Sequence, residues 1–235
     1  MAPKVVVGKS RVEAGRRLTP AIFEVDLRME DPPELGFEAG QWVSIPFGPK
    51  TVRAYSLASP PSSRRVITLC ADVAPGQIGS RWFTSLKVGD PVEFKGPMGG
   101  FVLKRADPRR PLFVAEEIGI VPIRSILWDC FQTGFGRPAT LIYWGRDPSW
   151  LAYDPEFRLL SRRYPAFGYL PVVREATGGW DGEKGEPEEA VERVVRSVEG
   201  LVAYVSGGGE TINRIRDVLM AKGLDRRSVK WEKFW

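Results

Sequence analysis

The pattern of the sequence changes near residue 110, and this change constrains the fold more than any other feature. The residues before it form short runs rich in Val, Ile, Phe and Tyr, separated by clusters of Gly, Pro, Asp and Ser. Such runs are typical of antiparallel strands. The residues after it alternate between apolar, strand-like runs and amphipathic helical segments, which is typical of a parallel sheet with helices on both faces. The sequence therefore predicts two domains of different architecture.

We expect residues 1–105 to form an antiparallel β-barrel domain and residues 106–235 to form an α/β domain with a parallel sheet. The barrel strands are predicted at 5–14, 21–29, 41–47, 52–59, 65–73 and 91–101, with one helix at 78–86. In the second domain, strands are predicted at 111–115, 139–145, 167–173, 201–207 and 228–234, and helices at 121–132, 154–163, 188–198 and 210–223. The polar stretch 176–189 reads as a mobile loop near the strand ends, where such sheets bind ligands.

The composition excludes several kinds of chemistry. The chain has no histidine and only two cysteines, Cys70 and Cys130, far apart in sequence. His-dependent catalytic triads, His-ligated metals, disulfide frameworks and four-cysteine metal sites are therefore not expected. No apolar run is long enough to span a membrane and the N-terminus does not resemble a signal peptide, so we expect a cytoplasmic protein. The formal net charge of +5 suits an acidic partner or a phosphate-bearing ligand.

Two segments of the barrel domain offer groups for a planar cofactor with a phosphate tail. Arg53, Tyr55 and Ser56 supply a cation, a flat ring and a hydroxyl at the end of a predicted strand. About twenty residues later Gly79 and Ser80 open a short helix, where backbone N–H groups can meet a phosphate. Either segment alone also fits an ordinary strand or an ordinary helix cap.

The second domain has two further unusual segments. Residues 206–209 read Ser-Gly-Gly-Gly between a strand and a helix, where one glycine would suffice for a tight turn, so a flat ligand could lie against this backbone. Residues 231–235 contain three aromatic side chains. We expect these rings to pack on a core edge or to stack on another ring, because chain ends are usually polar.

In this order, the features resemble the ferredoxin–NADP reductase superfamily across essentially the whole chain. In that family an RxYS segment binds the flavin, a helix after a GxxS segment holds its phosphates, and GPxGxF closes the barrel. A strand–GGTGIAP–helix unit then opens the nucleotide domain, a later strand ends in CGP, and the chain ends in an acidic residue and an aromatic one. The similar segments here are 53–56, 76–80, 96–101, 115–122, 206–208 and 232–235.

The resemblance implies a flavin enzyme that passes electrons between NAD(P)H and a separate one-electron carrier, namely a ferredoxin, a flavodoxin or an oxygenase component. The flavin is expected to be FAD rather than FMN, because the ending EKFW is most similar to bacterial ferredoxin/flavodoxin reductases. By resemblance, the flavin-binding residues are Arg53, Tyr55, Ser56, Gly79, Ser80, Arg81, Phe234 and Trp235. The implied nucleotide-binding residues are Gly119, Pro122, Arg146, Arg174, Gly207 and Gly208. The implied catalytic residues, beside the path of electron transfer, are Ser56, Ser206 and Glu232.

One departure from the family puts nucleotide binding in question. Glu116 and Glu117 stand where the family has two glycines, at the turn that would meet the pyrophosphate. Two like charges about 4 Å apart, at an effective dielectric constant near 20, repel by about 4 kcal/mol. The carboxylates could point away from the ligand, cap the following helix, or be offset by Arg146 and Arg174, and the sequence does not choose between these arrangements.

Two other functions follow from this departure. One is a flavin-bearing electron-transfer subunit of a larger complex, with weak or lost NAD(P) binding. The other is a non-catalytic binding protein on a decayed reductase fold, although the retained RAYS, glycine and EKFW segments disfavour it. Nucleic-acid binding is not expected, because the arginines are scattered rather than gathered in one stripe.

Overall fold

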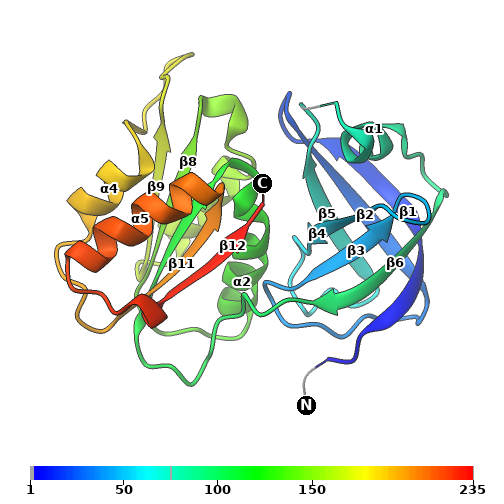
Figure 1. Cartoon of the computed structure of the whole chain (residues 1–235), viewed down its shortest axis with the longest axis horizontal. Coiled ribbons are helices and arrows are strands. Elements are labelled where there is room, and N and C mark those ends of the chain that lie inside the picture. Colours follow the sequence, from blue (N-terminus) through cyan, green and yellow to red (C-terminus); the bar gives the residue numbers. More distant parts are fainter. Residues whose placement is uncertain (1–2, 75, 235) are drawn as a thin grey trace. The chain divides into compact units, whose positions relative to one another are not determined.

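The computed structural model describes residues 3–74 and 76–234, and the chain divides into two compact units (Figure 1). The first comprises Met1–Leu103 and Val121–Gly134, and the second comprises Lys104–Ile120 and Phe135–Trp235. Within the described residues, no helix is both long enough and apolar enough to cross a membrane.

The first unit contains an antiparallel sheet with the strand order β4-β3-β6-β1-β2-β5. Its strands are β1 (Val6–Arg17), β2 (Ile22–Asp31), β3 (Trp42–Pro46), β4 (Val52–Ser56), β5 (Val66–Asp72) and β6 (Pro91–Met98). A bridge between Leu57 and Leu69 brings the chain after β4 to β5, so the two edges of the sheet approach each other. Apolar side chains that include Val25, Leu27 and Phe94 fill its interior, and helix α1 (Ile78–Ser85) adds Phe83 to this core. The predicted barrel is confirmed.

Helix α2 (Ile120–Gln132) follows a strand of the second unit, yet almost all of it belongs to the first unit. Two hydrogen bonds tie it to the chain after β4: Arg124 Nη1 donates to the Ala58 carbonyl at 2.8 Å, and Ser125 Oγ donates to the Ser59 carbonyl at 2.7 Å. The compact units therefore differ from a division of the chain at one point in the sequence, because α2 and the strand before it lie in different units.

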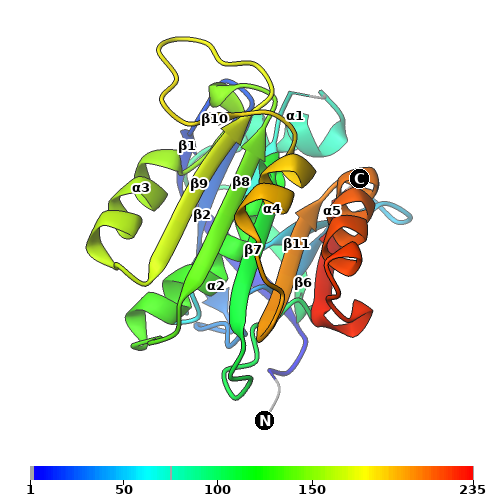
Figure 2. The ribbon, with the colours of Figure 1, turned by 90° about the vertical axis from the view of Figure 1, so that its left-hand side faces the viewer.

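The second unit contains a parallel sheet with the strand order β10-β9-β8-β7-β11-β12. Its elements in chain order are β7 (Arg110–Glu116), β8 (Ala139–Gly145), α3 (Asp154–Arg163), β9 (Phe167–Val173), β10 (Glu183–Lys184), α4 (Pro187–Val194), β11 (Leu201–Gly207), α5 (Gly209–Ala221) and β12 (Val229–Lys233). Helices α4 and α5 lie side by side (Figure 2) and pack Val191, Ile212 and Ile215 against one face of the sheet. The predicted α/β architecture is confirmed, including the bounds of β8, α3, β9 and β11.

The main differences from the predicted elements fall in the polar stretch 176–189. This stretch contains the short strand β10 and the first turn of α4, which begins at Pro187. Trp180 organises its tip: the indole Nε1 donates to the Glu183 carbonyl at 2.9 Å, and the Arg158 guanidinium lies over the Trp180 ring at 5.5 Å. The sequence pattern missed β10 because two residues are too few to show an alternation.

Candidate functional site

Tyr55 in β4 is the centre of an aromatic cluster in the first unit. Its ring centroid lies 4.9 Å from that of Phe83 and 6.2 Å from that of Trp82, and Phe47 meets the Trp82 ring edge to face at 5.4 Å. Burial raises the pKa of the Tyr55 phenol to about 12. The cluster therefore holds one predicted flavin-stacking ring in a defined position.

Gly79 is required by this cluster. A Cβ atom at position 79 would lie 2.6 Å from the Tyr55 hydroxyl oxygen, so any larger residue would push the ring away from α1. The resemblance places a flavin phosphate beside this glycine, and the close contact with Tyr55 is a second reason why position 79 has no side chain.

The start of α1 has the properties of a phosphate site. The Gln77 side chain at the N-cap makes no hydrogen bond to the first turn, so that turn is left without a side-chain cap. Arg53, on edge strand β4, is exposed and its guanidinium donates to the Val52 carbonyl. The exposed Arg81 guanidinium donates to the Gly76 carbonyl just before the helix. Uncapped N–H groups and two exposed cations fit the anionic tail of a flavin.

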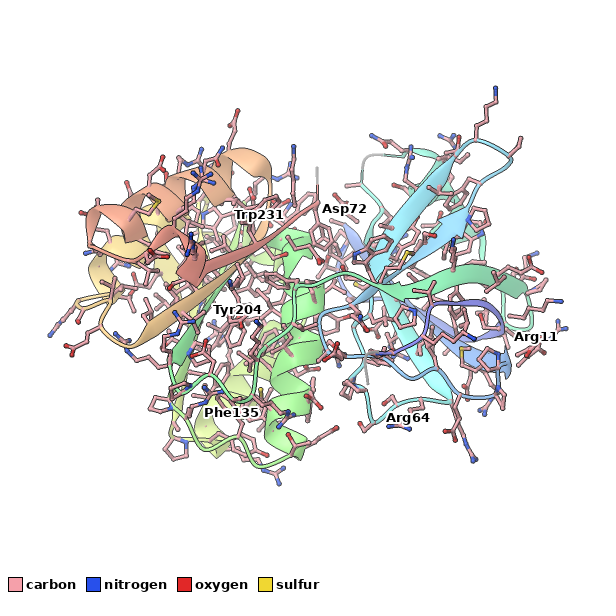
Figure 3. All side chains as sticks on the ribbon, turned by 60° about the horizontal axis from the view of Figure 1, so that its bottom comes forward. Arg11, Arg64, Asp72, Phe135, Tyr204 and Trp231 are labelled. Carbon is pink, nitrogen blue, oxygen red and sulfur yellow. The ribbon has the colours of Figure 1, made fainter. Side chains whose placement is uncertain are left out.

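Ser80 is turned toward the inside of the unit. It is buried, and its hydroxyl donates to the carbonyl of Asp72 at 3.2 Å (Asp72 is labelled in Figure 3). Ser80 is the third residue of α1, so it lies inside the helix rather than at the N-cap, and its hydroxyl bonds to the end of β5. Its backbone N–H still belongs to the uncapped first turn.

The raised pKa of Tyr55 predicts a specific alkaline behaviour. The phenol is expected to ionise near pH 10 in the unfolded chain and only near 12 in the folded one. The folded state thus binds the proton more tightly, and the free energy of unfolding falls as the pH rises above 10. The variant Tyr55→Phe should lack this part of the decline, which denaturant unfolding at pH 8, 10 and 11 would measure. Equal pH dependence of both proteins would contradict the assignment.

The second unit brings two of the predicted catalytic residues together. The parallel register pairs Ser206 of β11 with Glu232 of β12, so their side chains lie on the same face of neighbouring strands. Ser206 is 1% exposed, and its hydroxyl has no hydrogen-bond partner among the described residues. A buried hydroxyl without a partner is costly and fits a place where a ligand atom completes the bonding. Ser56 belongs to the first unit, where it is buried at the end of β4.

The predicted C-terminal aromatics are placed only in part. The N–H of Phe234 donates to the Gly207 carbonyl at 3.1 Å, which ties this residue to the end of β11. Trp235 lies outside the described residues. Trp231, labelled in Figure 3, is 56% exposed. The expectation that all three terminal rings need apolar surroundings is therefore wrong for Trp231, because an edge strand presents alternate side chains to solvent.

Glu116, at the end of β7, bonds to the backbone that follows the neighbouring strand β11. Its Oε2 accepts a hydrogen bond of 2.6 Å from the N–H of Gly208, the residue that caps the start of α5. Burial raises the pKa of the Glu116 carboxyl, while the bonds from Gly208 and Thr211 act in the opposite direction. Glu116 therefore caps a helix, as one of the three arrangements left open by the sequence allows, but the helix is α5 rather than α2.

Glu117 is neutralised by one of the predicted arginines. The Arg146 guanidinium donates to both Glu117 carboxylate oxygens, at 2.8 and 3.2 Å, and lies over the Trp150 ring at 3.8 Å. Glu117 is 4% exposed and has a backbone φ of +47°. This left-handed conformation costs a residue other than glycine about 1–2 kcal/mol, so the turn keeps a geometry suited to glycine while carrying a buried carboxylate.

Arg174 has a carboxylate partner of its own. Its guanidinium donates to Glu186 at 2.6 and 3.0 Å and lies over the Trp144 ring at 4.9 Å. The pairing raises the pKa of Arg174 and lowers that of Glu186. Arg174 is therefore held beside β9 by Glu186 and does not pair with either glutamate of the turn after β7.

The remaining predicted nucleotide residues shape the two turns. A Cβ atom at Gly119 would lie 2.3 Å from the Ser206 carbonyl oxygen, and one at Gly207 would lie 2.6 Å from Cβ of Glu116. Pro122 lies in the first turn of α2, where a missing N–H does no harm. The two turns are thus in direct contact, backbone against backbone.

Several residues of the site were missed by the sequence analysis. Phe83 and Trp82 around Tyr55, the two tryptophans under the arginines, and Glu186 all come from segments that look ordinary in sequence. The adjacent aromatics in α1 could have been noticed, because a short helix beside a barrel must turn one face inward. The pairing of Arg174 with Glu186 carries no sequence signal, since the loop between them could take many paths.

Comparisons with known proteins agree with this geometry. The family model for an oxidoreductase FAD-binding domain matches residues 11–103, and the model for an oxidoreductase NAD-binding domain matches residues 113–217. The chain belongs to the ferredoxin–NADP reductase superfamily. It carries an FAD-binding domain followed by an NAD-binding domain, in the order that this superfamily has. Both domains are of the oxidoreductase type.

Two curated relatives and one solved structure illustrate the similarity. The chain is 30% identical to the phenol 2-monooxygenase reductase component DmpP of Pseudomonas sp. (strain CF600), over 93% of this chain and 63% of the relative. It is 26% identical to ferredoxin–NADP reductase B of Sorangium cellulosum (strain So ce56), over 96% of this chain and 97% of the relative. The crystal structure of the Amycolatopsis cytochrome P450 reductase GcoB has the same fold, with a TM-score of 0.90 and 23% identity over 100% of this chain and 71% of the other. The chain thus spans less than two thirds of the first relative and nearly all of the second.

Proposed function

We propose that this protein is a flavin-dependent oxidoreductase that passes electrons between NAD(P)H and a separate one-electron carrier. Ferredoxins, flavodoxins and oxygenase components are the candidate carriers. The observation that supports this most is the aromatic cluster around Tyr55 beside the uncapped start of α1, inside the region that matches an FAD-binding domain. The names of the relatives, a ferredoxin–NADP reductase and an oxygenase reductase component, agree with these carriers.

In this proposal, residues 1–105 form the FAD-binding domain and residues 106–235 the NAD(P)-binding-like domain in sequence, although α2 of the second segment packs within the first compact unit. Tyr55 covers one face of the flavin ring, and Arg53, Arg81 and the first turn of α1 hold its phosphates. Phe234 and Trp235 remain candidates for the opposite face. Bound FAD would supply the conversion between a two-electron donor and one-electron acceptors. The protein acts in the cytoplasm, where such donors and carriers occur.

Ser56, Ser206 and Glu232 are the proposed residues beside the reacting atoms. The buried Ser206 hydroxyl can donate or accept at Oγ without breaking an existing bond, since it has no partner among the described residues. Glu232 pairs with it across β11 and β12 and can take or supply a proton at its carboxylate. Burial of Ser206 keeps water away from this point.

Absorption spectroscopy and anaerobic titration test the proposal. The purified protein, reconstituted with FAD and freed of excess, should show flavin absorbance in the visible range. NADPH or NADH should bleach it, and adding a ferredoxin or flavodoxin should restore it. A protein that remains colourless after reconstitution would contradict the proposal.

A second function, that of a flavin-bearing electron-transfer subunit with weak NAD(P) binding, is favoured by one observation. The Glu116 carboxylate already occupies the N–H of Gly208 at the end of β11. In that case dithionite would reduce the bound flavin and a carrier would reoxidise it, whereas millimolar NADPH would leave it oxidised. Fast bleaching at micromolar NADPH would exclude this second function.

The net charge of +5 predicts salt-dependent docking of an acidic carrier. Raising the ionic strength from about 50 mM to about 300 mM should slow electron transfer from the reduced protein to an acidic ferredoxin several-fold, because attraction between exposed charges is screened. Stopped-flow measurement at saturating reductant would follow this step. Rates that do not change with salt would rule out electrostatic docking.

A further inference from the structure

The sheet of the second unit has a topological switch point between β7 and β11. From β7 the chain adds β8, β9 and β10 on one side of the sheet, and then returns to place β11 and β12 on the other side. Ligands of open α/β sheets bind outside the carboxyl ends of the strands at such a point. Helix α5, which follows β11, would offer its N-terminal N–H groups to an anion there.

At the start of α5, the place that an anionic ligand would take is held by a side chain of the protein, the Glu116 carboxylate. Oε2 accepts the hydrogen bond from the Gly208 N–H, the first donor of α5, at 2.6 Å. The carboxylate also lies directly against the backbone, since a Cβ on Gly207 would come within 2.7 Å of Oε2. Thr211, in the first turn of α5, is a further hydrogen-bond partner of Glu116. The first N–H that a phosphate would use at the start of α5 is therefore engaged by a side chain of the protein.

The two arginines expected to bind phosphates are engaged in the same way. Arg146 is held by Glu117 through two hydrogen bonds, and Arg174 is held by Glu186 through two more. Both guanidinium groups also lie over tryptophan rings, which fixes their orientation. Three of the groups predicted to bind the nucleotide, the guanidinium groups of Arg146 and Arg174 and the N–H of Gly208, thus already bond to a carboxylate of the protein.

We propose that Glu116, together with Glu117, lowers the affinity of this protein for nicotinamide dinucleotides: a dinucleotide must displace the Glu116 carboxylate from the N–H of Gly208, and it therefore binds weakly. The inference rests on the proposed function in one respect, because the disfavoured ligand is NAD(P)H as electron donor. The weak binding would come from Glu116 and Glu117 themselves and not from the fold. The turns after β7 and β11 still approach each other closely, because Gly119 and Gly207 carry no side chains.

Equilibrium binding of ADP-ribose and NADP⁺ to the FAD-loaded protein tests the inference, with isothermal titration calorimetry as the readout. ADP-ribose carries the pyrophosphate but cannot accept electrons, so its binding is independent of catalysis. The variant Glu116→Gly/Glu117→Gly should bind both ligands at least tenfold more tightly than the wild type. The matched control Glu192→Gln/Glu199→Gln, which removes two exposed charges from the same unit, should bind them as the wild type does.

A more conservative variant keeps the test valid if the double glycine variant does not fold. Glu116→Gln retains an acceptor oxygen for the Gly208 N–H and removes the charge, so it should fold and bind ADP-ribose more tightly than the wild type by a smaller factor. Equal affinities of the wild type and the Glu116 variants would overturn the inference. So would an equal gain in the control variant, since only the net charge would then matter.

The pH dependence of ADP-ribose binding gives an independent check. Wild-type affinity should rise as the pH is lowered toward the pKa of Glu116, which burial holds above its ordinary value. The charged groups that face this carboxylate are Glu117 on the same turn, Arg214 on α5 and Arg174 after β9. Glu116→Gln should lose most of the dependence, and an unchanged pH profile would contradict the role of Glu116.

Failure of this inference can be told apart from failure of the proposed function. Transfer of electrons from the dithionite-reduced protein to a ferredoxin depends on the flavin and not on nucleotide affinity. If that transfer occurs while the wild type binds ADP-ribose as tightly as its glycine variant, only the inference fails. If no flavin binds, the proposed function fails, and the calorimetric comparison can still be made on the protein without flavin.

Discussion

Gly119→Ala is expected to destabilise the second unit by about 3 kcal/mol or more. The added Cβ would lie 2.3 Å from the Ser206 carbonyl oxygen and 2.6 Å from its carbonyl carbon. Both are backbone atoms of a central strand and cannot rotate away as a side chain could. The turn after β7 would have to move away from β11. Thermal or denaturant unfolding measures the loss.

Gly136→Ala is the matched control for this experiment. Gly136 belongs to the same unit, and a Cβ there would meet no atom within 4 Å. Its replacement should change stability by less than about 0.5 kcal/mol. If both variants unfold alike, the turn after β7 does not lie in close contact with the end of β11.

Tyr55→Ala is expected to weaken FAD binding by roughly thirtyfold. Loss of one stacked and partly buried aromatic ring costs about 2 kcal/mol when burial and ring-on-ring contact are combined. Removal of the ring also opens a cavity beside Phe83 and Trp82, so the first unit should lose stability as well. Equilibrium titration with FAD, followed by flavin fluorescence, measures the affinity.

Tyr55→Phe separates the ring from the hydroxyl. Phe keeps the packing against Phe83 and lacks only the hydroxyl, which lies beside Gly79. Its FAD affinity should stay within about threefold of the wild type. A loss as large as that of the alanine variant would mean that the ring face does not contact the flavin.

The two architectures were predictable because each rests on a local pattern. Alternating runs and turn residues before residue 105 give antiparallel strands, and apolar runs such as 201–207 give strands buried on both faces. Helix α3 and strand β9 were predicted to the residue for this reason. The membership of α2 in the first unit was not predictable, because Arg124 and Ser125 reach carbonyls more than 60 residues away in sequence.

The candidate site was predictable in its residue types but not in its pairings. The order of RAYS, the glycine segment and EKFW indicated the cofactor, and the two glutamates at 116 and 117 raised the question of nucleotide binding. Which partner each glutamate takes depends on the strand order. Strand β7 lies between β11 on one side and β8 on the other. Glu116 therefore reaches Gly208, while Glu117 reaches Arg146 at the end of β8. Such contacts are set by the tertiary fold, and no spacing in the sequence encodes them.

Equilibrium dialysis of the purified chain against FAD tests the central claim most directly. The account predicts saturable binding of one FAD per chain, with an affinity roughly thirtyfold lower in Tyr55→Ala. Absence of saturable FAD binding by the folded wild-type protein would contradict it.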